Sequence, residues 1–399
     1  MMPGMDTTPP PPRRLASVDA YRGFVMLLLL AECLRLGDVS KALPTSGLWQ
    51  FLAFHQSHVP WVGCSLHDLI QPSFSFLVGV ACVFSLAKRR TRPDAWWRLP
   101  LHTAGRALVL VGLGVWLRFR DNFGVNWTFE DTLAQIGLGY PLLVWLGLRS
   151  WSTQVVALFA ILGLYWSAFV AFPAPGPDFF WPGVGVPNDW PHHPAGFAAH
   201  WDKNSNAAWA FDGWLLNLFP RTKPFTHNGG GYATLSFVPT LGTMVLGLLA
   251  GAVLKSDTRP RRKLATLAAA GVGLLIAGYA LGWLGVCPVV KRIWTPSWTL
   301  FSGGWCFLLL AGFYALTDAV GRPGWSLPLR VIGANSILAY LLENLAIGPM
   351  RKGLYQLVGK KPFQSFGDAY EPLLSGAAIL AVIWVGLAVL YRYRLFLRI

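Results

Sequence analysis

The sequence predicts an all-α protein: a polytopic bundle of about ten transmembrane helices, with an eleventh left open and both termini cytoplasmic. Hydrophobic residues fill 54% of the 399 positions and charged residues only 13%, far less charge than a soluble domain of this length carries. Apolar runs of about 20 residues, the length that crosses the hydrocarbon layer, recur along the whole chain. Basic residues cluster between these runs, so the net charge of +15 indicates orientation signals and not nucleic-acid binding.

Ten apolar segments predict the helices. They lie at 18–36, 64–87, 101–118, 130–148, 152–172, 233–254, 264–284, 298–318, 328–348 and 373–393. The Pro-rich stretch 1–14 is expected to be a disordered tail, so residues 15–399 form one transmembrane domain. Residues 173–231, rich in Pro, Gly and Trp, are too polar to span and are expected to form an outer lid or substrate-facing loop.

The distribution of charge between the helices predicts the orientation. More than half of the 33 Lys and Arg residues fall in short segments on the side that carries both termini. The positive-inside rule therefore places that side in the cytoplasm. The long loops, 37–63 and 173–231, then lie on the outer side.

The first predicted helix carries ionisable residues near both ends. Asp19 and Arg22 are three positions apart, so they share a helix face and can pair at the cytoplasmic interface. Glu32 lies some ten residues deeper, near the outer end. A carboxylate there faces the bundle interior or a water-filled cavity instead of lipid, so Glu32 is a candidate for chemistry.

The stretch "HQSHVPWVGCSLHDLIQPSF" (55–74) brings titratable groups to the mouth of the second helix. His58 precedes it, His67 and Asp68 open it, and Pro72 interrupts it, as is typical of a cavity-lining segment. A histidine can take and return a proton, and a nearby aspartate can orient it. The histidines can equally be ordinary interfacial residues. A zinc site is the weaker interpretation, because only His55 and His58 have ligand-like spacing.

Other polar residues fall inside predicted spans. Asp131 and Gln135 share one face at the start of the fourth helix, and Asn335 lies in "GANSILAY". Such groups at membrane depth are candidates for binding, although Asn and Gln also bond helices to one another.

Six motifs in order make the chain resemble one family. They are "SVDAYRGFVMLLLL", "HVPWVGCSLHDLIQPSFSFLVGV", "DTLAQIGLGYPLL", "YATLSFVPTLGTMVLGLLAG", "IWTPSWTLFSGG" and "GANSILAY". Together they resemble the membrane acyltransferase family of heparan-alpha-glucosaminide N-acetyltransferase and its bacterial relatives, from about residue 13 to the C-terminus.

The resemblance implies transfer of an acetyl group from cytosolic acetyl-CoA to an amino sugar or glycan across the membrane. It makes His58 the catalytic histidine and matches Asp68 to the Asp of the same motif. Glu32 stays a further catalytic candidate because of its position in the first helix, not because of the resemblance. The predicted substrate- or CoA-binding residues are Asp19 and Arg22, which match the first-helix motif, together with His67, Asp131, Gln135, Asn335 and Trp294. Glu32 and Cys33 stand where the animal enzyme has an Asn, and His67 where it has a small residue. The animal enzyme's large luminal domain is also missing here, so the acceptor stays open.

The same resemblance implies the surroundings of the reaction. Acetyl-CoA is the expected co-substrate, and no metal and no nucleic acid are expected. The expected partners are membrane lipids, the acyl donor and the sugar acceptor, with a homodimer left open. The protein is expected in a bacterial inner membrane with its long loops in the periplasm.

Two other classes of function compete with acyl transfer. A proton-coupled exporter of a sugar or lipid-linked precursor would also need intramembrane carboxylates, but no internal repeat relates the two halves of the sequence. A structural scaffold is disfavoured, because buried Asp, Glu and His are costly in lipid.

Overall fold

The computed structural model describes residues 15–90, 97–121 and 125–397, and in these ranges it contains helices and no strand. The predicted all-α class is confirmed. The α-helices are α1 (Ala16–Leu30), α2 (Leu36–Ala42), α3 (Gly47–His55), α4 (Ile70–Arg90), α5 (Leu99–Asp121), α6 (Thr132–Gly147), α7 (Trp151–Ala171), α8 (Ala207–Leu215), α9 (Phe237–Lys255), α10 (Pro260–Trp283), α11 (Pro296–Tyr314), α12 (Leu327–Ala334), α13 (Ser336–Val358) and α14 (Glu371–Arg392). The predicted tail, 1–14, lies outside the described residues.

Single turns connect these helices. They are η1 (Ala31–Leu34), η2 (His67–Leu69), η4 (Trp181–Val184), η5 (Gly196–Trp201), η6 (Leu216–Leu218), η7 (Thr234–Ser236), η8 (Ala315–Ala319), η9 (Pro323–Ser326), η10 (Lys361–Gln364) and η11 (Asp368–Tyr370).

Each of the ten predicted segments is helical, but the count of ten spans is not confirmed. Seven helices in the described residues are long and apolar enough to cross a membrane, or eight if the bent pair α12–α13 is one span. The prediction of one continuous helix over 328–348 is wrong, because the chain bends by 64° at Asn335 and forms two helices. The first helix ends at Leu30 instead of residue 36, since η1 and the left-handed Arg35 (φ 51°) follow it. The helix α6 has only 16 residues.

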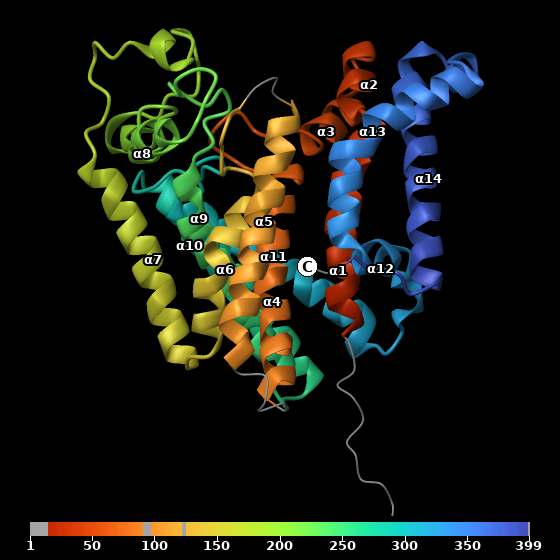
Figure 1. Ribbon diagram of the computed structural model, residues 1–399, viewed down its shortest axis with the longest axis horizontal. Coiled ribbons are helices and arrows are strands. Elements are labelled where there is room, and N and C mark those ends of the chain that lie inside the picture. Colours follow the sequence, from red (N-terminus) through yellow and green to blue (C-terminus); the bar gives the residue numbers. More distant parts are fainter. Residues whose placement is uncertain (1–14, 91–96, 122–124, 398–399) are drawn as a thin grey trace, which may run out of the picture.

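The helices form two groups that meet along α1 (Figure 1). One group contains α1, α12, α13 and α14, and the other contains α4 to α11. Tyr21 of α1 joins them: its hydroxyl donates to Ser73 Oγ of α4 at 2.8 Å, and its ring stacks on Phe313 of α11 at 5.5 Å. These contacts fix the distance between the groups and hence the width of the space between them.

Glycines allow the closest approach between α1 and α12. A Cβ atom on Gly23 would lie 1.8 Å from the Leu329 carbonyl oxygen, and one on Gly333 would lie 2.2 Å from that of Asp19. The motifs "DAYRGF" and "VIGAN" therefore interlock backbone to backbone, which only glycine permits.

The loops sort onto two ends of the bundle. Figure 1 shows α2, α3 and α8 at the upper end, and the start of α1 and the end of α14 at the lower end. The connection between α9 and α10, with its basic residues, also lies at the lower end. This separation agrees with the predicted alternation; the assignment of the lower end to the cytoplasm stays a prediction.

Candidate active site

The loop that carries His58 is fixed against a second loop. Ser65 Oγ donates to the Ser57 carbonyl at 2.5 Å and closes the loop on itself. Val62 forms an isolated antiparallel bridge with Val290, and the Gly63 amide donates to the Val289 carbonyl at 3.0 Å. These bonds bring the segment between α10 and α11 against His58.

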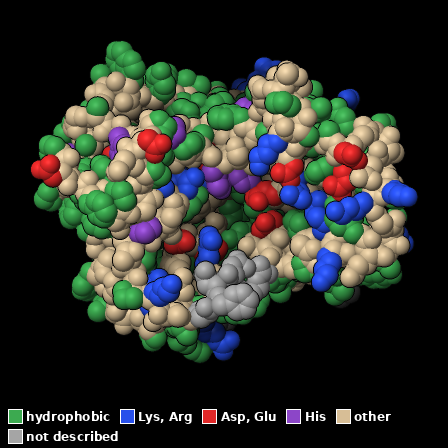
Figure 2. Space-filling view, turned by 90° about the horizontal axis from the view of Figure 1, so that it is seen from above, with side chains coloured by type: hydrophobic (Ala, Val, Ile, Leu, Met, Phe, Trp, Pro, Cys, Tyr) green, Lys and Arg blue, Asp and Glu red, His purple; other side chains and the backbone are tan. Residues whose placement is uncertain are grey.

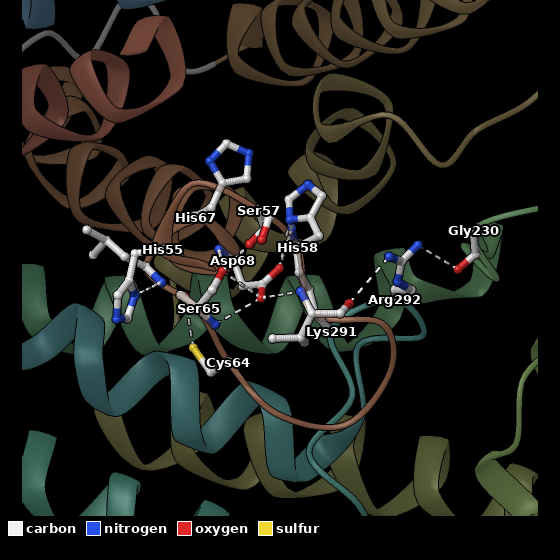
Figure 3. Close-up of polar contacts among 12 residues, drawn as sticks. His55, Ser57, His58, Cys64, Ser65, His67, Asp68, Gly230, Lys291 and Arg292 are labelled. Atoms are coloured by element: carbon white, nitrogen blue, oxygen red, sulfur yellow. Dashed lines mark hydrogen bonds and ion pairs between the residues drawn. The ribbon is translucent and has the colours of Figure 1, made fainter. Parts of the chain in front are cut away.

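Three side chains meet at this contact (Figure 3). His58 Nδ1 lies 2.8 Å from Asp68 Oδ1, and Lys291 Nζ lies 3.0 Å from His58 Nδ1 and 3.3 Å from Asp68 Oδ1. Asp68 and Lys291 are buried, with 1% and 4% of their surfaces exposed, whereas the His58 side chain is 36% exposed. His58 is therefore the member of this trio that faces open space.

The neighbours of Asp68 fix the protonation of His58. Asp68 Oδ2 accepts hydrogen bonds from the backbone amides of Ser65, at 3.0 Å, and Val59, at 3.3 Å, so the carboxylate is surrounded by donors. His58 Nδ1–H then donates to Oδ1, and the lone pair of the neutral ring is on Nε2. Burial lowers the pKa of His58 and Lys291 lowers it further, although the bond to Asp68 opposes both effects. The ring is thus held neutral as a proton acceptor.

A second histidine pair borders the first. His67, at the start of η2, is buried, and its Nε2 lies 3.0 Å from Glu32 Oε1 of η1. The ring centroids of His58 and His67 are 4.6 Å apart. Glu32 therefore pairs with His67. Its relation to His58 is indirect, since the two histidine rings lie side by side.

Of the five side chains in these two groups, all except Asp68 line a cavity of about 180 Å³ between the two helix groups. Figure 2 shows the hollow from the upper end, with histidines at its edge and acidic and basic side chains around it. The complete lining is Met26, Leu29, Glu32, His58, His67, Ile70, Gln71, Phe74, Leu117, Arg118, Glu130, Asp131, Thr132, Tyr232, Lys291, Tyr340, Glu343 and Asn344.

A further part of the cavity wall is also polar. Asp131 caps α6 by accepting from the Leu133 amide at 2.9 Å, and its Oδ2 accepts from the Tyr340 hydroxyl at 3.0 Å. Arg118 Nε lies 3.8 Å from the same carboxylate, and Asn228 donates to Glu130 at 2.9 Å. The wall therefore joins α5, α6, α13 and the outer loop around a carboxylate-rich surface.

Several predicted site residues lie together, and others do not. His58, His67, Glu32 and Asp131 line the cavity, and Asp68 lies directly behind His58. The remaining predicted residues, which are absent from the described lining, are Asp19, Arg22, Gln135, Trp294 and Asn335.

The residues outside the lining have contacts within the fold. Asp19 and Arg22 form the expected ion pair, at 3.4 Å. Gln135 donates to the Ala233 carbonyl at 3.2 Å, and the buried Trp294 donates to Thr243 at 3.1 Å. Asn335 holds the chain after α14, donating to the Leu395 carbonyl at 3.0 Å.

Sequence reasoning missed important members of the site. Lys291, Arg118, Glu130, Tyr232 and Tyr340 were not predicted to belong to it. For Lys291 there was a signal, since "GVCPVVKRIW" places a lysine next to an apolar segment on the predicted outer side. In the described part of the chain, no three His, Cys, Asp or Glu side chains are grouped as metal ligands.

Comparison with known proteins gives a distant but nearly full-length match. No family model matches the chain. Proteins named heparan-alpha-glucosaminide N-acetyltransferase from Homo sapiens and Mus musculus are each 23% identical to it, over 443 and 433 residues. The matches cover 97% of this chain, which spans about 60% of the length of these curated relatives. The chain is thus a membrane protein distantly related to heparan-alpha-glucosaminide N-acetyltransferase, as its six motifs predicted.

Proposed function

We propose that the protein is an integral-membrane acyltransferase in which His58 is the general base. The donor is acyl-CoA, with acetyl as the proposed group, and the acceptor is an amino sugar or glycan on the outer side. The observation that carries the proposal is the His58–Asp68–Lys291 trio on the wall of a cavity between two helix groups. The two relatives bear the name of an N-acetyltransferase, which agrees with this chemistry.

The geometry supports a direct transfer. The acceptor nitrogen or oxygen attacks the thioester carbonyl, and His58 Nε2 takes the proton that the nucleophile loses. The tetrahedral intermediate then breaks its carbon–sulfur bond. The imidazolium returns the proton to the leaving sulfur, so the products are the acylated acceptor and the free thiol of CoA.

Asp68 and Lys291 serve His58 in different ways. Asp68 keeps the proton on Nδ1 and stabilises the imidazolium that forms during attack. Lys291 balances the buried charge of Asp68 and, at 3.0 Å from Nδ1, opposes a resting imidazolium. The base is thereby available near neutral pH and gives its proton back readily.

The shape of the cavity suits the reacting ends of the substrates. Its volume of about 180 Å³ is below the range of sites that enclose whole drug-sized ligands. The acyl thioester and the ring that carries the nucleophile are therefore the parts that we place in it. Met26, Leu29, Phe74 and Leu117 supply an apolar surface for the acyl group and the pantetheine arm.

We place the CoA phosphates at the lower end, which we take as cytoplasmic, in a bacterial inner membrane. The forked guanidinium of Arg and the compact ammonium of Lys both bind phosphate. Basic residues lie in the segments 88–98 and 255–263. Arg106, which donates to the Tyr140 hydroxyl at 3.1 Å, is a further candidate on α5.

Label transfer tests the proposal. The purified protein in lipid nanodiscs is given acetyl-CoA labelled in the acetyl group and a panel of amino sugars and cell-wall fragments. We expect labelled acceptor to accumulate with an equal amount of free CoA thiol. A protein that neither binds acetyl-CoA nor releases CoA would contradict the proposal, and movement of an unmodified sugar across the membrane would favour transport instead.

A further inference from the structure

The pair formed by His67 and Glu32 takes no part in the transfer described above, yet it borders the same cavity. His67 Nε2 lies 3.0 Å from Glu32 Oε1, and the His67 ring is 4.6 Å from that of His58. The two histidines point different nitrogens at their carboxylates, Nδ1 in His58 and Nε2 in His67. A neutral His67 that donates Nε2–H to Glu32 has its lone pair on Nδ1.

The proton balance of acyl transfer to an amine requires a second acceptor. The ammonium of an amine beside electron-withdrawing groups, like that of an α-amino group, loses its proton above neutral pH, so at neutral and acidic pH an amine acceptor arrives mostly as R–NH₃⁺. That ion has no lone pair and cannot attack. The whole reaction is R–NH₃⁺ + acyl-S-CoA → R–NH–acyl + HS-CoA + H⁺, so one proton passes from amine to sulfur and one must leave the site.

His58 is suited to the first proton and unsuited to the second. Its Nδ1 is enclosed by Asp68 and Lys291, which are 1% and 4% exposed, so no route to water runs through that nitrogen. Its Nε2 must be unprotonated when the amine attacks. The carboxylate beside His67 differs in this respect, because the Glu32 side chain is 40% exposed.

We propose that His67 and Glu32 form a proton exit that converts the acceptor ammonium into the free amine before His58 acts. His67 Nδ1 takes the proton from R–NH₃⁺, the Nε2 proton passes to the Glu32 carboxylate, and Glu32 releases it to water. Glu32 ends the relay ionised, as it began. His67 ends it with the proton on Nδ1, so the ring must reorient and return to the tautomer protonated on the Glu32 side before the next cycle. This inference rests on the proposed acyl transfer and narrows the acceptor to an amine.

The charged surroundings of the pair favour a cationic ligand. Besides Glu32, the titratable groups that border the same cavity are His58, Arg118, Glu130, Asp131, Tyr232, Lys291, Tyr340 and Glu343, with Asp68 behind His58. The carboxylates Glu130, Asp131 and Glu343 face the space from α13 and the approach to α6. They can attract an ammonium, and the Glu32 carboxylate combines a contact to the buried His67 with an exposed side chain.

Two variants and two reactions test the proton exit. His67→Gln and Glu32→Gln keep hydrogen-bonding capacity but cannot relay a proton. His192→Gln, a ring change in the outer loop with an edge contact to Trp190, is the matched control. Acetyl transfer to glucosamine is followed from acidic to alkaline pH, and hydrolysis of acetyl-CoA by water, which involves no ammonium, is followed beside it.

We expect both variants to lose about tenfold or more of the kcat/KM for glucosamine below neutral pH. The loss should shrink towards zero as alkaline pH supplies the free amine directly. Hydrolysis of acetyl-CoA by these variants should lose less than transfer does at acidic pH and should show no recovery at alkaline pH. Every activity of the control should stay within about twofold of the unaltered protein.

Other outcomes overturn the inference. A loss that is equal at every pH would assign the pair a structural or binding role, and an equal loss in hydrolysis would make it part of the common machinery. Variants that behave as the unaltered protein at acidic pH would remove the pair from the reaction. Failure of the proposed function is distinguishable, because the unaltered protein itself would then neither transfer acetyl nor release CoA at any pH.

Discussion

Two His–Asp pairs of almost identical geometry lie in different regions of the described part of the chain. His58 Nδ1 lies 2.8 Å from Asp68 in the loop beside the cavity, and His193 Nδ1 lies 2.7 Å from Asp202 in the outer loop. Both carboxylates are buried, with 1% and 2% of their surfaces exposed. The bond between the rings and their carboxylates therefore does not distinguish the two regions.

What surrounds each pair does distinguish them. Lys291 contacts both members of the first pair, whereas among the described residues no Lys or Arg side chain forms an ion pair with Asp202. His193 lies against Trp181 at 4.2 Å and Trp190 at 5.4 Å, and its Nε2 is buried without a partner in the described part of the chain. A His–Asp pair can act as a base only where Nε2 meets a substrate, so the second pair is a support for the outer loop.

Replacing each histidine by alanine should give the largest difference between the two pairs. His58→Ala removes the general base, and we expect acetyl transfer to fall by about 10²–10⁴-fold while the protein still folds. His193→Ala should keep turnover within a few fold and lower the melting temperature, because it opens a gap between two tryptophans. The measurement is the label-transfer rate together with thermal unfolding in the same detergent. Near-normal transfer by His58→Ala would remove this residue from the mechanism.

Replacing Lys291 should make the first pair resemble the second. Lys291→Met removes the positive charge that lowers the pKa of His58, so that pKa rises. His58 must be neutral to act, so the acidic limb of the kcat/KM profile should move to higher pH, by about one unit. Transfer should fall about tenfold on the acidic side and recover on the alkaline side. A uniform loss at all pH values would argue instead that Lys291 contacts the substrate.

Local pattern in the sequence was enough to predict the long helical segments, although one of the ten bends at Asn335. The first pair was predicted from the resemblance to a known family, which singled out His58 and matched Asp68, and not from spacing alone. Lys291 is 233 positions from His58 and reaches it only because two loops pair through Val62 and Val290. Loop-to-loop contacts of this kind leave no periodic signal in a single sequence.

The same limit explains the predicted residues that lie outside the cavity. Gln135 and Asn335 were singled out as polar groups at membrane depth, and their amides satisfy backbone carbonyls of other segments. An amide used between helices and an amide offered to a substrate have the same sequence signature. Glu32 differs: the sequence predicted that it faces the bundle or a cavity near the outer end of the first helix, but its pairing with His67 required the tertiary structure.

A third carboxylate, Asp212 of α8, extends the comparison to a buried acid with neither histidine nor lysine bonded to it. Its Oδ2 accepts from the Thr234 amide at 2.9 Å, and burial raises its pKa to about 7. Below the pKa that Asp212 has in the unfolded chain, near 4, its carboxyl group is protonated in both the folded and the unfolded state and does not change the free energy of unfolding. Between about pH 4 and 7 it ionises only in the unfolded chain, so stability falls as pH rises through this window and stays lower above it.

Asp212→Asn keeps the acceptor and removes the ionisation, so it should raise the melting temperature by a few degrees at pH 8 and hardly change it at pH 4. Thermal unfolding at the two pH values measures this, and an equal shift at both would show that ionisation of Asp212 is not the cause.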